Sequence, residues 1–291
     1  MPNSYGSLLA RAAAFAVRHP GLWLLGFLVS SSFGGGTGDL ARVLESGTID
    51  VGPLSPYLAA VALFLVFLGL VFLLFTVLAE GALIHAVSEA ESGRGASLSS
   101  ATAAGVRFYA RLLALYLAIF LLLFVLLLLL VGMPLLFWKA LGSSLVVTVL
   151  LVVALAPPYF LLALGAIYVF QWAPRVAVVH GKGPLGALAE TARTLRRGAG
   201  RAFSIVVGSL LNEVIALTIF VLAAIPFTVI AFLLFAIDPF LVLLPAVPFV
   251  ALSLVYLGVK GTFTSAYWTL AFLGDASDRS ASWWDGSAGG I

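Results

Sequence analysis

The chain has 291 residues, of which 63% are apolar and only 9% are charged. An average soluble domain has about 25% charged residues, because its surface must be polar. The composition therefore excludes a soluble enzyme, a disordered chain and a secreted disulfide scaffold. It predicts an all-α membrane protein that crosses the bilayer several times. The absence of cysteine also excludes thiolate chemistry and cysteine-bound metals.

Six apolar stretches reach or approach the length of about 20 residues that a helix needs to cross a membrane. They are Leu22–Phe33, which can be extended backward through Leu8, Tyr57–Leu78, Leu112–Val131, Leu145–Phe170, Ser204–Ala236 and Phe240–Val259. Prolines interrupt the last three stretches and are expected to kink them. The sequence therefore predicts a polytopic helical bundle of about six transmembrane helices.

Lysine and arginine are distributed unevenly among the segments that join these spans. Twelve of the 15 lie in the N-terminal segment, the second-to-third loop, the fourth-to-fifth loop or the C-terminal tail. The opposite side has only Arg42 and Lys139, while Lys260 ends the sixth span. Because cytoplasmic loops carry the excess of basic residues, we expect both termini in the cytoplasm. The opposite loop, residues 34–55, could hold a short helix over Asp39–Glu45.

The fourth-to-fifth loop is predicted to form an amphipathic helix over Leu185–Arg201. Basic residues recur there at intervals of three or four: Arg193, Arg196, Arg197 and Arg201. The other side of the helix is assigned to Leu188, Ala189, Ala192 and Leu195. Such a helix can lie on an anionic leaflet, so we predict that the four arginines contact lipid headgroups. The alternative is that they only fix the orientation of the chain.

An internal repeat is also suggested by the sequence. Gly93-Arg94-Gly95 and Gly181-Lys182-Gly183 are 88 residues apart, and a polar helix and a span follow each. Shared membrane topology could produce the same likeness. The predicted organisation is a single membrane domain over residues 1–274, with repeats of helical hairpins over 1–92, 93–180 and 181–274, and a flexible cytoplasmic tail over 275–291.

Ionisable residues inside spans are costly and are therefore functional candidates. Asn212 and Glu213 lie about a dozen residues into the fifth span, near the middle of the bilayer. They could line a transport path, or they could bond between helices, which is the reading we favour. Glu80 and Lys260 could form an ion pair near the inner interface if the second and sixth spans adjoin. Alternatively, Lys260 extends to the lipid phosphates and Glu80 faces water.

No pattern of catalytic, nucleotide-binding or metal-binding residues is recognisable. His85 and Glu89 share a helix face, but two such ligands do not make a metal site. We therefore expect no enzyme activity, no cofactor and no metal. The basic residues occupy short loops, so nucleic acid is not an expected partner. Membrane lipids are the expected partners, with other envelope proteins as further candidates, and the oligomeric state stays open.

Three stretches, Ala13–Phe27, Gly81–Val87 and Gly181–Arg197, resemble an uncharacterised group of bacterial polytopic membrane proteins. The group is similar to the membrane domain fused to some glycerophosphoryl diester phosphodiesterases. The resemblance implies a six-span helical module, but these 291 residues have no counterpart of the phosphodiesterase domain. With this resemblance, we expect a non-enzymatic envelope module of the bacterial inner membrane that interacts with lipid or organises partner proteins. The alternative is a transporter or channel that uses Glu213 and Asn212.

Overall fold

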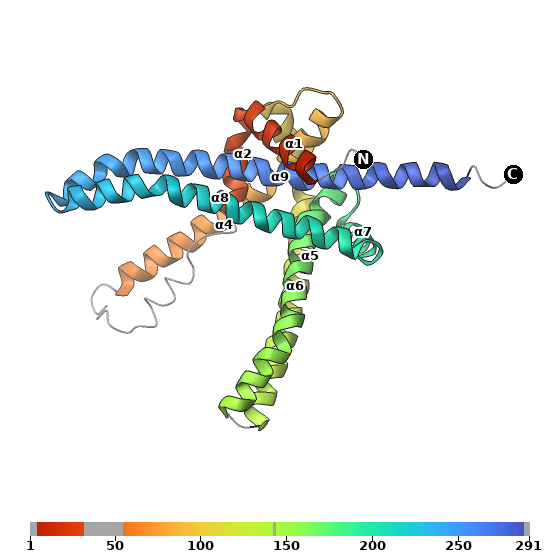
Figure 1. Cartoon of the computed structure of the whole chain (residues 1–291), viewed down its shortest axis with the longest axis horizontal. Helices are drawn as coiled ribbons and strands as arrows, with labels where there is room; N and C mark the ends of the chain where they lie inside the picture. The colour runs from red at the N-terminus through yellow and green to blue at the C-terminus, as the bar shows by residue number, and fades with distance from the viewer. Residues whose placement is uncertain (1–4, 32–54, 142–143, 288–291) are drawn as a thin grey trace. The chain divides into compact units, whose positions relative to one another are not determined.

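The computed structural model describes residues 5–31, 55–141 and 144–287. Within these ranges it has eight α-helices, two short 3₁₀ helices and no strand (Figure 1). In chain order the α-helices are α1 (Tyr5–Arg18), α2 (Trp23–Ser31), α4 (Ser55–Glu91), α5 (Leu98–Leu141), α6 (Leu145–Val179), α7 (Pro184–Arg197), α8 (Ala199–Phe235) and α9 (Leu243–Ser287). The predicted all-α class is confirmed.

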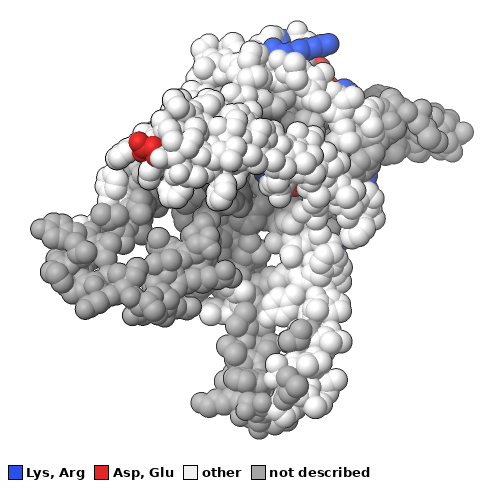
Figure 2. All heavy atoms as spheres, turned by 60° about the vertical axis from the view of Figure 1, so that its left-hand side comes forward, with Lys and Arg blue, Asp and Glu red and all other residues white. Residues whose placement is uncertain are grey.

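Five of the described helices are long and apolar enough to cross a membrane. The qualifying stretches are Phe67–Glu91, Leu98–Leu129, Thr148–Val179, Ala199–Phe235 and Pro239–Asp275. The described surface in Figure 2 is almost entirely uncharged. Large apolar side chains such as Leu129 and Phe232 are more than half exposed on these helices, which would be costly in water. The chain is therefore a multi-pass integral membrane protein.

The first predicted span differs from a straight helix. Residues 6–18 and 20–30 meet at 87°, so they form either one broken span or a re-entrant loop. The predicted backward extension through Leu8 is therefore wrong as a continuous helix. Pro20 causes the break, because it has no N–H to donate and disfavours helical geometry at His19, whose φ and ψ are −122° and 64°. The nine residues of α2 span only about 14 Å.

The chain divides into two compact units. One consists of residues 1–107 and 215–267, and the other of residues 108–214 and 268–291. The predicted repeats concern sequence similarity, so this division does not test them. The predicted helix over Asp39–Glu45 lies outside the described residues.

In the first unit, α2 is in close contact with α4 and α9. Thr262 on α9 donates a hydrogen bond to the carbonyl of Leu22 (3.2 Å), and Thr76 on α4 donates one to the carbonyl of Leu28 (2.9 Å). A Cβ atom on Gly258 would lie 2.8 Å from the carbonyl oxygen of Trp23. Small residues and hydroxyl groups thus let these helices approach at backbone distance, as in other membrane bundles.

In the second unit, α6 and α9 share a buried aromatic cluster. Tyr168 and Trp172 stack at 4.9 Å, and Trp172 meets Phe272 edge-on at 5.2 Å between ring centroids. The indole N–H of Trp268 donates to the hydroxyl of Ser209 on α8 (3.1 Å). These aromatic rings are among the largest fully buried side chains, and each removes a large apolar area from the surface.

Arg175 was expected in the fourth-to-fifth loop, but it lies within α6 and is fully buried. Its guanidinium donates to the backbone carbonyl and the side-chain oxygen of Gln171, one turn earlier. The helix extends nine residues beyond Phe170, the predicted end of the span. The loop therefore contains one basic residue fewer than the sequence suggested.

The predicted helix over Leu185–Arg201 is divided in two. α7 ends at Arg197, Gly198 adopts a non-helical conformation, and Arg201 belongs to α8. The φ and ψ of Gly198 are −136° and 44°, and its N–H still donates to the carbonyl of Thr194, which closes the last turn of α7. At the other end of the chain, α9 continues to Ser287, past residue 274, where the tail was expected to begin. The flexibility of the tail stays a prediction.

Candidate functional site

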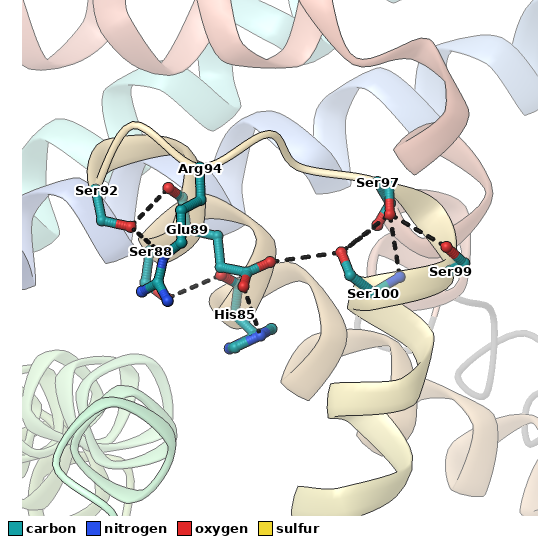
Figure 3. Close-up of polar contacts among 8 residues, drawn as sticks. All are labelled: His85, Ser88, Glu89, Ser92, Arg94, Ser97, Ser99 and Ser100. Carbon is teal, nitrogen blue, oxygen red and sulfur yellow. Dashed lines mark hydrogen bonds and ion pairs between the residues drawn. The ribbon is translucent and has the colours of Figure 1, made fainter.

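A cluster of polar side chains surrounds the turn between α4 and α5 (Figure 3). His85 and Glu89, one turn apart on α4, approach to 3.5 Å between Nε2 and Oε1. Glu89 also accepts a hydrogen bond from the hydroxyl of Ser100 on α5 (3.4 Å). The side chain of Arg94 donates through Nε to the hydroxyl of Ser92 (3.1 Å). The predicted sharing of a face by His85 and Glu89 is thus seen in the structure.

Local sequence explains why the chain turns here. Gly93 has a φ of +76°, a left-handed conformation that favours glycine, and it lies two residues after Glu91, the last residue of α4. The backbone N–H of Arg94 donates to the carbonyl of Glu89 (3.0 Å), which closes the helix end. Ser97 then caps α5, since its hydroxyl accepts from the backbone N–H of Ser100 (3.1 Å). The turn is therefore held by hydrogen bonds at both ends.

A cavity of about 510 Å³ lies between α1 and this turn, and we call it the α1 pocket. Its charged lining consists of Arg11 and Arg18 from α1, with Glu91 and Arg94 from the end of α4 and the turn. Arg11 forms an ion pair with Glu91. His19 also lines the pocket, and its Nδ1 donates to the carbonyl of Phe15 (2.9 Å). The pocket is therefore lined by more positive than negative side chains.

A second polar group joins the end of α6 to α7. Glu190 on α7 accepts from His180 Nδ1 (2.9 Å) and forms an ion pair with Lys182. Burial raises the pKa of Glu190, but the hydrogen bonds and positive charge of Lys182 and His180 outweigh it and lower the pKa below its usual value. Gly181, which lies between His180 and Lys182, has a φ of +65°, and Gly93 after α4 is left-handed as well. The group fixes α7 against the end of α6.

The four predicted headgroup arginines do not all lie on one helix. Arg193, Arg196 and Arg197 are exposed on α7, whereas Arg201 is on α8 and forms an ion pair with Asp275 (3.1 Å). The buried face of α7 is formed by Ala187 and Thr191. Of the residues assigned to its apolar side, Leu188 and Leu195 are half-buried, but Ala189 and Ala192 are exposed. The basic face of α7 thus has three of the four predicted arginines, and their contact with lipid stays a prediction.

The predicted intramembrane residues are partly enclosed. Asn212 and Glu213 are half-buried on α8. Glu80 on α4 is only 5% exposed, and Lys260 on α9 is half-buried. Both α4 and α9 contact α2. The ion pair between Glu80 and Lys260, like the transport role of Asn212 and Glu213, stays a prediction.

The α1 pocket is the feature that sequence reasoning missed. Arg11 and Arg94 were treated only as topology signals, and 83 positions separate them in the chain. The available signal was that the sequence assigned both residues to the same side of the membrane. Among the described residues, no group of three or more His, Asp or Glu is placed to hold a metal ion.

Comparison with known proteins adds no relative. No family model, curated protein or solved structure matches this chain.

Proposed function

We propose that this integral membrane protein is a non-enzymatic lipid-interacting module of the bacterial inner membrane, with both termini in the cytoplasm. We also propose that the protein is similar to the membrane domain that is fused to some glycerophosphoryl diester phosphodiesterases. The single observation that carries it is α7, a short helix fixed to α6 on one face, with Arg193, Arg196 and Arg197 exposed.

The physical basis is electrostatic. A basic residue close to an anionic membrane surface contributes about 1 kcal/mol of attraction. The three arginines lie in the last two turns of α7, and Leu185 in its first turn is 77% exposed. A helix with exposed basic and apolar side chains is suited to the boundary between headgroups and acyl chains. The ion pairs of Glu190 hold α7 in place against α6.

The proposal can be tested with purified protein in detergent, mixed with equal amounts of phosphatidylglycerol and phosphatidylcholine. Native mass spectrometry then counts the lipids of each kind that stay bound. We expect a preference for phosphatidylglycerol that falls about tenfold or more in a variant with Arg193, Arg196 and Arg197 changed to Gln, given about 1 kcal/mol for each charge.

The matched control removes charge at Arg42 and Lys139, which the sequence assigns to the opposite membrane face. This variant should keep the preference of the wild type. Equal binding of both lipids by the wild type, or an unchanged preference in the triple variant, would contradict the proposal.

A further inference from the structure

The α1 pocket brings together three guanidinium groups from two distant parts of the chain. Arg11 and Arg18 come from α1, and Arg94 comes from the turn after α4. Arginine presents paired N–H donors in a planar fork that matches the oxygens of a phosphate group. We propose that the α1 pocket binds the phosphate of an anionic phospholipid headgroup. This rests on the lipid-interacting role proposed above and gives it a second, separate site.

The charges of the pocket favour phosphate only moderately. Arg11 is already paired with Glu91. α1 and α4 both end at the pocket, and the carbonyl end of a helix carries about half a negative charge. These groups offset much of the positive charge, so Arg18 and Arg94 are the principal donors. Free phosphate in water should therefore bind weakly.

The position of the pocket favours a lipid over free phosphate. The apolar stretch Phe67–Glu91 ends at Glu91 in the pocket wall, and the stretch after Arg18 begins at Pro20 beside it. Both apolar stretches thus end at the pocket, and we infer from this that the pocket lies at the level of the headgroups. The indole of Trp23 donates to the carbonyl of Ala16 (2.8 Å) at the same level, where tryptophan is common. Lipid headgroups at this level are present at a high local concentration, which compensates for weak intrinsic binding of the phosphate.

The bend of 87° makes the pocket possible. A straight helix through Pro20 would carry Arg11 about 14 Å along the helix axis from Pro20, away from the end of α4. The break instead turns α1 aside, and its buried residues Ala12, Phe15 and Ala16 pack within the protein. Arg11 and Arg18, seven residues apart on the same helix face, then both reach the pocket.

The test uses the purified full-length chain in detergent and measures the dissociation constant for three probes. The probes are dioctanoyl phosphatidylglycerol, dioctanoyl phosphatidylcholine and inorganic phosphate. We expect saturable binding that is tightest for phosphatidylglycerol. In Arg18→Gln/Arg94→Gln its affinity should fall at least about tenfold, because two charge-assisted contacts are lost. Arg42→Gln/Lys139→Gln, which the sequence assigns to the opposite membrane face, should keep the wild-type affinity for the short lipid.

A variant that keeps the charge protects the test against misfolding. Arg18→Lys/Arg94→Lys loses the planar forks and should bind between the wild type and the glutamine variant. If the glutamine variant, or the lysine variant where the former does not fold, binds phosphatidylglycerol like the wild type, the inference is overturned. Equal or tighter binding of inorganic phosphate overturns the lipid assignment, as does equal binding of phosphatidylcholine. If the variant with Arg193, Arg196 and Arg197 changed to Gln loses the lipid preference while Arg18→Gln/Arg94→Gln keeps its affinity, the proposed function is supported and this inference is overturned.

Discussion

The backbone of Gly261 on α9 lies directly against the carbonyl group of Gly26 on α2. A Cβ atom at either position would clash with the facing helix at a distance that real Cβ atoms do not show. Gly258 makes a similar approach to Trp23. These glycines let α2 and α9 pack at backbone distance, which a larger residue would prevent.

Gly261→Ala should therefore destabilise the protein. The added methyl group meets backbone atoms, which cannot move aside as a flexible side chain can, and such overpacking costs about 1–3 kcal/mol. The measurement is the thermal unfolding midpoint in detergent. Gly69→Ala on α4 is the matched control, because its Cβ meets nothing within 4 Å. That variant should be neutral or slightly stabilised, since Ala favours helix. A Gly261→Ala variant as stable as Gly69→Ala would contradict the observed packing.

Ser209→Ala should destabilise the second unit. It removes the acceptor of the indole N–H of Trp268, a side chain with no exposed surface. A buried donor that loses its acceptor costs about 1–3 kcal/mol. The unfolding midpoint again provides the measurement. Ser204→Ala is the control, because Ser204 is exposed and bonds only the carbonyl one turn earlier in its own helix. Equal midpoints for the two variants would show that the Trp268 bond contributes nothing.

The sequence predicted the spans well because the apolar character that marks a span is summed over about 20 residues. Runs such as Leu112–Val131 are apolar throughout, and no other structure satisfies their backbone in lipid. The helix bounds were predicted less well. The fourth and sixth spans were predicted to end at Phe170 and Val259, but α6 and α9 continue beyond both residues. Gly261, just after Val259, packs closely against Gly26 on α2, which depends on a partner helix that the sequence does not name.

The α1 pocket was beyond sequence reasoning for a related reason. Its lining combines α1 with a turn about 80 residues later, so it exists only when the helices are packed. The first span was predicted to extend backward through Pro20, although the effect of proline on helix geometry is local and predictable. Local chemistry thus predicts where helices stop, whereas pockets depend on tertiary contacts.

Acid should weaken the link between α6 and α7. The pKa of Glu190 is lowered in the folded protein, because its hydrogen bonds and charge interactions with Lys182 and His180 outweigh burial. A carboxyl group whose pKa is lowered on folding stabilises the fold at pH values above its unfolded pKa, about 4.5. This contribution is lost as the pH falls through the pKa of the folded protein. Glu190→Gln should therefore unfold at a lower temperature than the wild type at pH 7, and the difference should shrink below about pH 4.5. A constant difference at both pH values would contradict this linkage.

The predicted orientation can be tested because the chain has no cysteine, so each introduced thiol reports one position. Leu185→Cys on α7 and Ser99→Cys at the start of α5 are both exposed. We expect them to react with a membrane-impermeant maleimide only after spheroplasts are opened, because the basic loops that contain them should be cytoplasmic. Ser46→Cys, in the loop assigned to the opposite face, should react in intact spheroplasts. Since α7 and the α1 pocket are both proposed to contact lipid of the inner leaflet, labelling of Leu185→Cys from outside would reverse the orientation and move both sites to the outer leaflet.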